Sequence, residues 1–146
     1  MQKIIECVPN FSEGRNKKKI AAIVTAIKSV PKIALLDQTS DPSHNRSVIT
    51  FTGPPEAVVL AAFLAVKKAA ELIDMDKHKG VHPRLGATDV LPLIPLKGVS
   101  MKECVKYALK LGKRIGEELK IPVYMNEKAA RRVDRKNLAD LRRGEY

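Results

Sequence analysis

The stretch RSVITFTGPPEAVVLAAFLAVKKAAELID, residues 46–74, holds a strand, a turn and a long helix in direct succession. The first seven residues are mostly β-branched or aromatic, and alternation places Ile49 and Phe51 on one face of the predicted strand. Gly53 and the proline pair after it open the helix, because proline is tolerated in a first helical turn. The alanine-rich helix then packs closely on a sheet. The stretch therefore predicts a sheet with a helical layer.

The segments on either side extend this pattern. Asn16 is placed to cap one helix, and Ser100 with Glu103 forms a capping box for another. Strands are expected at residues 4–8, 33–37, 46–52, 89–96 and 122–125, helices at 17–30, 54–74, 100–119 and 126–146, and polar loops at 39–45 and 74–88. The first six elements have the order β-α-β-β-α-β, which predicts an α+β fold. We expect a ferredoxin-like (split βαβ) mixed sheet with helices on one face, extended by an extra α-β-α.

Length and composition set the broad class. A chain of 146 residues without a repeat or linker is expected to form one domain, residues 1–146. Its net charge of +11 favours anionic partners such as nucleic acid, a membrane surface or small polycarboxylates. Aromatic residues make up only 4%, so side chains that stack on nucleic-acid bases are scarce. Two cysteines, no signal-peptide pattern and no apolar stretch of membrane-spanning length favour a cytoplasmic protein.

Three strands are nearly continuous apolar runs. IIECV, IALLD and VLPLIPL have few of the alternating polar residues that a solvated sheet face requires. With helices on one side only, the other face of the sheet would be uncovered. We expect another subunit or a second domain to pack there, although short apolar runs are also typical of ordinary strong strands.

Polar residues gather in three loops, at residues 10–15, 37–46 and 78–89. All three histidines, His44, His78 and His82, fall in the last two. They are either ordinary loop histidines or parts of a reactive site. No acidic triplet or cysteine pair accompanies them, so a metal site is not expected. The Gly14-Arg15 and Gly86-Ala87-Thr88 turns have the residue types of an anion-binding turn.

His82 is the strongest candidate for proton transfer. It precedes Pro83, whose ring holds the preceding residue extended, and Arg84 adds a permanent positive charge nearby. An imidazole on such a stiff segment loses little entropy when it is positioned. Its ordinary pKa near 6.5 suits proton transfer at neutral pH.

Four blocks of the sequence resemble one known family. They are CVPNFSEGR (7–15), HNRSVITFTGPPE (44–56), IDMDKHKGVHPRLGATDVLPLIP (73–95), and PVYMNEKAARR (122–132) with RRGEY (142–146). In this order they are similar to the amino-terminal subdomain of glutamate formimidoyltransferase, the formiminotransferase half of formimidoyltransferase-cyclodeaminase. The resemblance implies transfer of a formimino group from N-formimino-glutamate to N5 of tetrahydrofolate, in histidine breakdown. The co-substrate is then tetrahydrofolate, and no metal is implied.

The resemblance also implies roles for individual residues. His82 corresponds to the histidine of the family's G-E-H-P-R motif and is expected to be the general acid and base, although Val81 replaces the motif's glutamate. Residue type and position, rather than the resemblance, lead us to expect that Asp37 stabilises a cationic amidinium and that Arg46 and Arg84 bind substrate carboxylates. The full set of expected substrate-binding residues is Asn10, Asp37, Asn45, Arg46, Arg84, Gly86, Thr88 and Asp89.

The family's second subdomain has no counterpart within these 146 residues. We expect the uncovered sheet face to form a homodimer or to bind a partner subdomain. Two alternatives stay open: a folate-binding module without turnover, and a basic nucleic-acid-binding domain. The second is less expected, because much of the excess charge lies on helix faces and in the tail.

Overall fold

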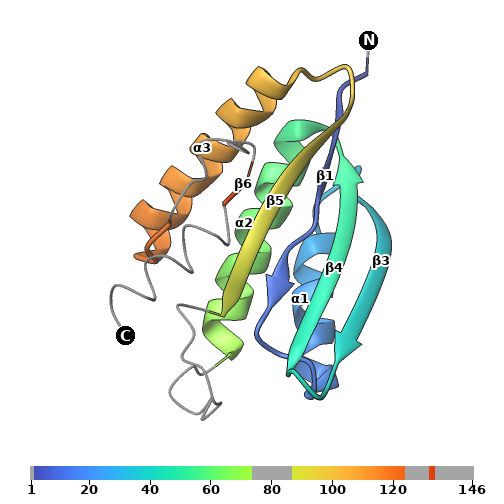
Figure 1. The fold of residues 1–146 in the computed structure, drawn as a ribbon, viewed down its shortest axis with the longest axis vertical. Coiled ribbons are helices and arrows are strands. Elements are labelled where there is room, and N and C mark those ends of the chain that lie inside the picture. Colours follow the sequence, from blue (N-terminus) through green and yellow to red (C-terminus); the bar gives the residue numbers. More distant parts are fainter. Residues whose placement is uncertain (1, 74–86, 124–131, 134–146) are drawn as a thin grey trace.

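The computed structural model describes residues 2–73, 87–123 and 132–133 of the chain. In chain order the elements are β1 (Ile4–Cys7), β2 (Asn10–Phe11), α1 (Lys17–Lys28), β3 (Ala34–Asp41), β4 (Arg46–Gly53), α2 (Pro55–Leu72), β5 (Thr88–Lys97), α3 (Met101–Leu119) and β6 (Arg132–Val133). Figure 1 shows how the helices and the sheet are layered. The expected α+β class is confirmed.

The strands form one sheet, in which β4 lies between β3 and the β1–β2 line, and β5 lies between that line and β6. Every pairing among the described strands is antiparallel. The expected mixed sheet is therefore wrong. β1 and β3, which α1 connects, are not neighbours, because β4 lies between them with the opposite direction.

The first strand is longer than the sequence indicates, and Pro9 divides it. β1 and β2 both lie between β4 and β5, so they are two halves of one line. The ladder continues across the gap, because Val8 donates its N–H to the carbonyl of Pro92 and the Pro9 carbonyl accepts from Ile49, each at 3.2 Å. Proline has no N–H of its own to donate. A prolyl residue here interrupts the strand without ending it.

The hairpin β3–β4 also extends beyond its expected limits. Residues 39–41, expected as part of a loop, are paired with β4, with Thr39 opposite Val48 and Asp41 opposite Arg46. Leu36 is an extra residue between the pairs made by Leu35 and Asp37, and it forms a bulge. Cross-strand pairing has overridden the polar composition of this segment.

The carboxy-terminal part of the chain agrees less well with expectation. Residues 122–123 are not in a strand, and the rest of the expected strand at 122–125 lies outside the described residues. Within the expected helical tail, residues 132–133 form β6 instead, paired with Leu91 and Pro92. The remainder of 126–146 lies outside the described residues.

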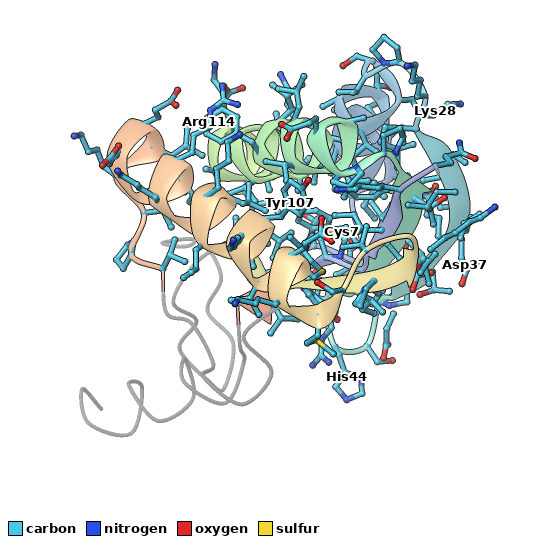
Figure 2. The ribbon with its side chains drawn as sticks, turned by 90° about the horizontal axis from the view of Figure 1, so that it is seen from above. Cys7, Lys28, Asp37, His44, Tyr107 and Arg114 are labelled. Atoms are coloured by element: carbon cyan, nitrogen blue, oxygen red, sulfur yellow. The ribbon has the colours of Figure 1, made fainter. Side chains whose placement is uncertain are left out.

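The helices are close to their expected limits. Asn16 caps α1 by accepting the N–H groups of Lys18 and Lys19, and the Ser100–Glu103 capping box begins α3. α2 contacts β1, β4 and β5 on one face of the sheet, with α1 on one flank and α3 on the other (Figure 2). Its alanines at 61, 62, 65 and 69 are buried, which lets the helix axis approach the sheet closely.

One face of the sheet is buried and the other is not. The buried face points toward the helices and contains the fully buried side chains of Ile5, Ile49, Phe51 and Leu93. The opposite side, which we call the open face, consists of half-buried residues: Ile4, Glu6, Val8, Asn10, Arg46, Val48, Thr50, Thr52, Val90, Pro92 and Ile94. At its margins Leu36 and Leu96 are 57% and 52% exposed. The three helices do not cover this face.

Within the part of the chain that the structure describes, no helix combines the length and the hydropathy that a membrane crossing requires.

The two faces of β4 provide a test of this layering. Phe51 is fully buried against the helices, so Phe51→Ala should lower the free energy of unfolding by about 3–5 kcal/mol. Thr50 lies on the open face of the same strand, and Thr50→Ala should cost less than about 1 kcal/mol. Urea unfolding of both variants measures the difference. Equal losses would contradict the one-sided core.

Candidate functional site

Three segments that are far apart in sequence meet at one end of the sheet. The first segment, residues 12–16, follows β2. The second, residues 41–46, contains the end of β3, the turn and the start of β4. The third, residues 87–88, contains Ala87 and the first residue of β5. Ser12 donates its N–H to the Ala87 carbonyl and Gly14 donates to Asn45 Oδ1, each at 2.8 Å. The Arg15 side chain donates from Nε to the Pro42 carbonyl, also at 2.8 Å. We call these three segments the strand-end cluster.

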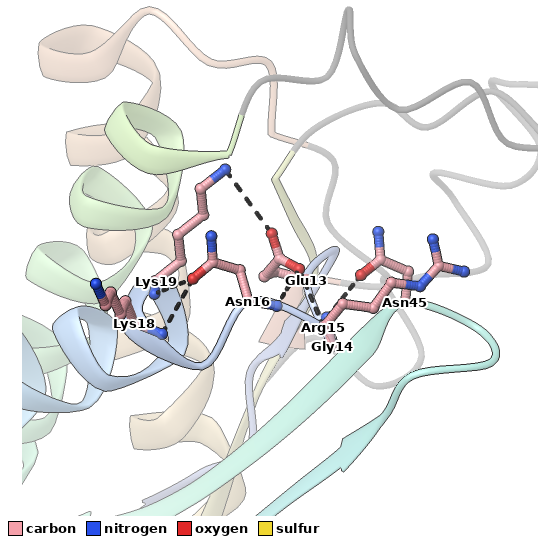
Figure 3. Close-up of polar contacts among 7 residues, drawn as sticks. All are labelled: Glu13, Gly14, Arg15, Asn16, Lys18, Lys19 and Asn45. Carbon is pink, nitrogen blue, oxygen red and sulfur yellow. Dashed lines mark hydrogen bonds and ion pairs between the residues drawn. The ribbon is translucent and has the colours of Figure 1, made fainter.

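Glu13 is the buried charge of the strand-end cluster, with 5% of the residue exposed. Its Oε2 accepts the N–H groups of Arg15 and Asn16 at 3.1 and 3.0 Å (Figure 3). Lys19 Nζ lies 3.9 Å from its Oε1. Burial of a carboxylate is costly unless it is hydrogen-bonded and paired, and both conditions are met here. Glu13 therefore fixes the turn between β2 and α1.

Gly14 brings two backbones into contact. A Cβ built on it would lie 2.5 Å from both the amide nitrogen and the carbonyl oxygen of Arg46, and 2.6 Å from the Asp41 carbonyl oxygen. Only glycine fits such an approach without movement of a backbone. Asn45, the residue before Arg46, has a φ of 51°. Asparagine adopts this left-handed conformation more readily than most residues.

The Gly14-Arg15 turn is not a vacant anion-binding turn. The Gly14 N–H is already donated to Asn45 and the Arg15 N–H to Glu13. The anion-binding expectation is wrong here, because the side-chain oxygens of Asn45 and Glu13 already accept these two N–H groups.

The antiparallel register brings three of the expected site residues to the open face. Asn10 lies opposite Val48 on one side and Val90 on the other. Arg46 lies two residues before Val48, and Asp37 is paired with Thr50, two residues after it. The result is an amide, a guanidinium and a carboxylate spread over neighbouring strands. The Asn10 amide donates locally, to the Val8 carbonyl at 3.3 Å.

Three polar atoms near the cluster are buried without a partner among the described residues: Arg46 Nε, Ser47 Oγ and Thr88 Oγ1. Ser47 and Thr88 both pair with Phe11, one on each flanking strand. Buried polar atoms are normally hydrogen-bonded, so these three atoms have hydrogen-bonding capacity that the described residues do not use. Sequence reasoning singled out neither Glu13 nor Ser47. The alternation that pairs Ile49 with Phe51 would have placed Ser47 on the same buried face, whereas Glu13 lies in a polar loop with no local signal of burial.

His44 lies at the rim and has a partner. Its Nδ1 is 2.6 Å from Asp41 Oδ2, and its backbone N–H donates to Asp41 Oδ1 at 3.2 Å. The hydrogen bond from the His44 side chain, with the backbone one, holds the pKa of Asp41 below its ordinary value. Figure 2 shows Asp37 and His44 on the side of the sheet away from α2.

The other expected residues fall partly outside the described part of the chain. His78, His82, Arg84 and Gly86 lie outside the described residues, as does the side chain of Asp89. Thr88 begins β5, and Asn45 precedes β4.

The described residues contain no group of three or more histidine, cysteine or acidic side chains arranged to hold a metal ion. Cys7 and Cys104 are both buried, and neither forms a disulfide. Burial raises the pKa of the Cys7 thiol well above its ordinary value, so this side chain acts as a core residue.

Comparison with known proteins gives one consistent result. The formiminotransferase domain, N-terminal subdomain, matches residues 4–146. Glutamate formimidoyltransferase of Streptococcus pyogenes is 49% identical over the whole chain, and the enzyme of the same name from Thermoplasma acidophilum is 54% identical over 95% of it. Formimidoyltransferase-cyclodeaminase of Mus musculus is 53% identical over the whole chain. The chain spans 49%, 46% and 27% of these three relatives.

Substitution of two glycines should have opposite effects. Gly14→Ala places a methyl group against the Arg46 backbone, and overpacking of this kind should cost roughly 1–3 kcal/mol. In α3 a Cβ on Gly116 meets only the Ile121 carbonyl, at 3.8 Å, so Gly116→Ala should stabilise by about 0.5–1 kcal/mol through helix propensity. Thermal unfolding gives both signs. A neutral Gly14→Ala would show that the cluster is not closely packed.

Proposed function

The chain belongs to the formiminotransferase family as its N-terminal subdomain, and from this premise we propose that it forms one wall of a folate-dependent formiminotransferase site. The reaction is transfer of a formimino group from N-formimino-glutamate to tetrahydrofolate, as one step of histidine breakdown in the cytoplasm. The observation that carries the proposal is that Asn10, Asp37 and Arg46 lie on one face of three neighbouring strands, the open face, at strands that lead into the strand-end cluster.

The residue types suit the substrates. Both the donor and folate carry carboxylates, which the guanidinium of Arg46 can bind through two parallel hydrogen bonds. The Asp37 carboxylate can stabilise a cationic amidinium carbon, and the Asn10 amide can bind the edge of a pterin. A net charge of +11 raises the local concentration of anionic substrates around the chain.

The chemistry needs one group that both accepts and donates a proton. N5 of tetrahydrofolate attacks the amidine carbon, a C–N bond forms, and a tetrahedral adduct results. The imidazole of His82 takes the proton from N5 and then gives it to the nitrogen of the departing glutamate as the old C–N bond breaks. Chain length supports this role, because only four residues lie between His82 and Ala87 at the cluster, and the five residue steps between them span at most about 18 Å.

We assign the sheet itself to the split βαβ, ferredoxin-like type. The strand order supports this, since β4 lies between β1 and β3, and the β1–β2 line lies between β4 and β5. A site on its open face has only one wall until a second layer covers it.

A second copy of this chain is our proposed cover. The open face carries half-buried apolar side chains such as Val48, Val90 and Ile94, which a solvated surface does not favour. The glutamate formimidoyltransferase relatives contain about as much chain again as this one. Two copies would therefore match the length of such a relative and enclose the site.

Replacement of His82 tests the chemistry. His82→Ala should reduce turnover of N-formimino-glutamate with tetrahydrofolate by about 10²–10⁴-fold, the usual contribution of a general acid–base residue. Folate binding should remain, because the imidazole acts on the proton in transit. The matched control is His44→Ala, whose ring is held by Asp41 at the rim, and its turnover should stay within the same order of magnitude as wild type.

Wild-type protein that binds folate without turnover, at any protein concentration, would contradict the transferase proposal and indicate a folate-binding module. Binding of nucleic acid in place of folate, with a steep dependence on salt, would overturn both.

Replacement of one open-face residue tests the proposed dimer. Ile94→Lys places a charge in the proposed interface and should shift the mass in solution from two chains to one. Leu109 on α3 is 51% exposed and lies outside that interface, so Leu109→Lys should leave the mass unchanged. Light scattering at several concentrations measures both. A wild-type monomer throughout would contradict the dimer and leave the one-wall site for another partner.

A further inference from the structure

We propose that Glu13 is a positioning residue that holds Arg46 in its substrate-binding geometry through Gly14 and Asn45. The inference rests on the proposed function for its consequence, since Arg46 is there the ligand of a substrate carboxylate. The positioning itself is argued from contacts among the described residues. Nothing in the resemblance assigns a role to Glu13.

The first step is the fixed turn. The Glu13 carboxylate accepts two successive backbone N–H groups, from Arg15 and Asn16, and is paired with Lys19. Three interactions on one buried side chain leave the turn a single conformation. The neutral Glu13→Gln variant keeps an oxygen acceptor but loses the charge that strengthens all three interactions.

The second step is the contact between the turn and β4. Gly14 follows Glu13 directly, donates to Asn45 Oδ1, and touches the Arg46 backbone with no room for a methyl group. A shift of Gly14 must therefore move Asn45, Arg46 or both. One contact acts on Arg46, the first residue of β4, and the other acts on Asn45, the residue before it.

The third step is the Arg46 side chain. Its Nε is buried and has no partner among the described residues, so no side chain of the described part anchors this atom. Because this atom is buried, a shift of the Arg46 backbone displaces it, and the guanidinium moves with it. Glu13 fixes the turn that contains Gly14, and Gly14 contacts the Arg46 backbone. Through Gly14, Glu13 therefore limits where that backbone can lie.

The consequence is an effect on binding rather than on the chemical step. Misplacement of a substrate-binding group by a distant substitution can cost up to about 100-fold. For Glu13→Gln we expect the KM for N-formimino-glutamate to rise about 10-fold while kcat changes less than about threefold, the pattern of lost uniform binding. In an Arg46→Lys background the same substitution should add little, because both variants then affect one interaction.

A measurement without substrate decides the structural part. The Nε–Hε proton of Arg46 gives an NMR signal, identified by its loss in Arg46→Lys. In Glu13→Gln this signal should shift or broaden, while the circular dichroism spectrum stays native. The matched control is Glu118→Gln, which breaks an exposed ion pair with Arg114 on α3 and should leave the signal and the KM unchanged.

An unchanged Arg46 signal in folded Glu13→Gln would overturn the inference whatever the turnover. If Glu13→Gln does not fold, Asn45→Gly replaces it, because glycine accepts a φ of 51° and the variant removes the acceptor for the Gly14 N–H; the same shift is expected. Absence of turnover in wild-type protein would contradict the proposed function alone, and the NMR comparison would still support or overturn the role of Glu13.

Discussion

The structure depends on a sheet that buries only one of its faces. Antiparallel strands alternate their side chains, and the helices α1 and α2 occupy the side where Ile5, Ile49 and Phe51 point. Hydrophobic burial there supplies most of the driving force for folding. Side chains that the core does not need, polar ones included, are left on the other face. The candidate site lies where that face meets the strand-end cluster.

The strand-end cluster holds three segments in fixed positions at one end of the sheet. Three segments meet there, and their contacts include N–H groups donated by Ser12 and Gly14 and a buried carboxylate at Glu13. Such contacts are short and directional, whereas apolar packing is not. The same end of the sheet holds buried hydroxyls on Ser47 and Thr88 without partners in the described part of the chain. A rigid frame with unused polar atoms is well suited to a polar ligand.

Local signals predicted α1, α2 and α3 well, but not the end of the chain, where β6 lies within the expected helix 126–146. The Asn16 cap and the Ser100–Glu103 box are contained within a few residues, so propensity alone locates α1 and α3. Long-range pairing was harder to predict. β2 was missed because Pro9 resembles a strand end, and the polar residues 39–41 resemble a loop until β4 pairs with them. The direction of neighbouring strands, and hence the antiparallel sheet, depends on which strands are adjacent rather than on any single segment.

Some residues of the candidate site were chosen from the sequence, and others were not. Asn10, Asp37 and Arg46 were chosen by residue type and position, and the register places all three on the open face. Glu13 was seen only as part of a polar loop, because its role depends on residues 41–46 across the sheet. His82 was chosen from its place before Pro83 and from the resemblance, and it lies outside the described residues.

The proposed site requires that folate binds on the open face beside the strand-end cluster. NMR titration of the uniformly labelled protein with tetrahydrofolate tests this most directly. We predict that the largest shift changes fall on Asn10, Arg46, Val48 and Val90, with α1 and the outer side of α3 unaffected. Changes confined to the helical side, with these four residues unmoved, would contradict it.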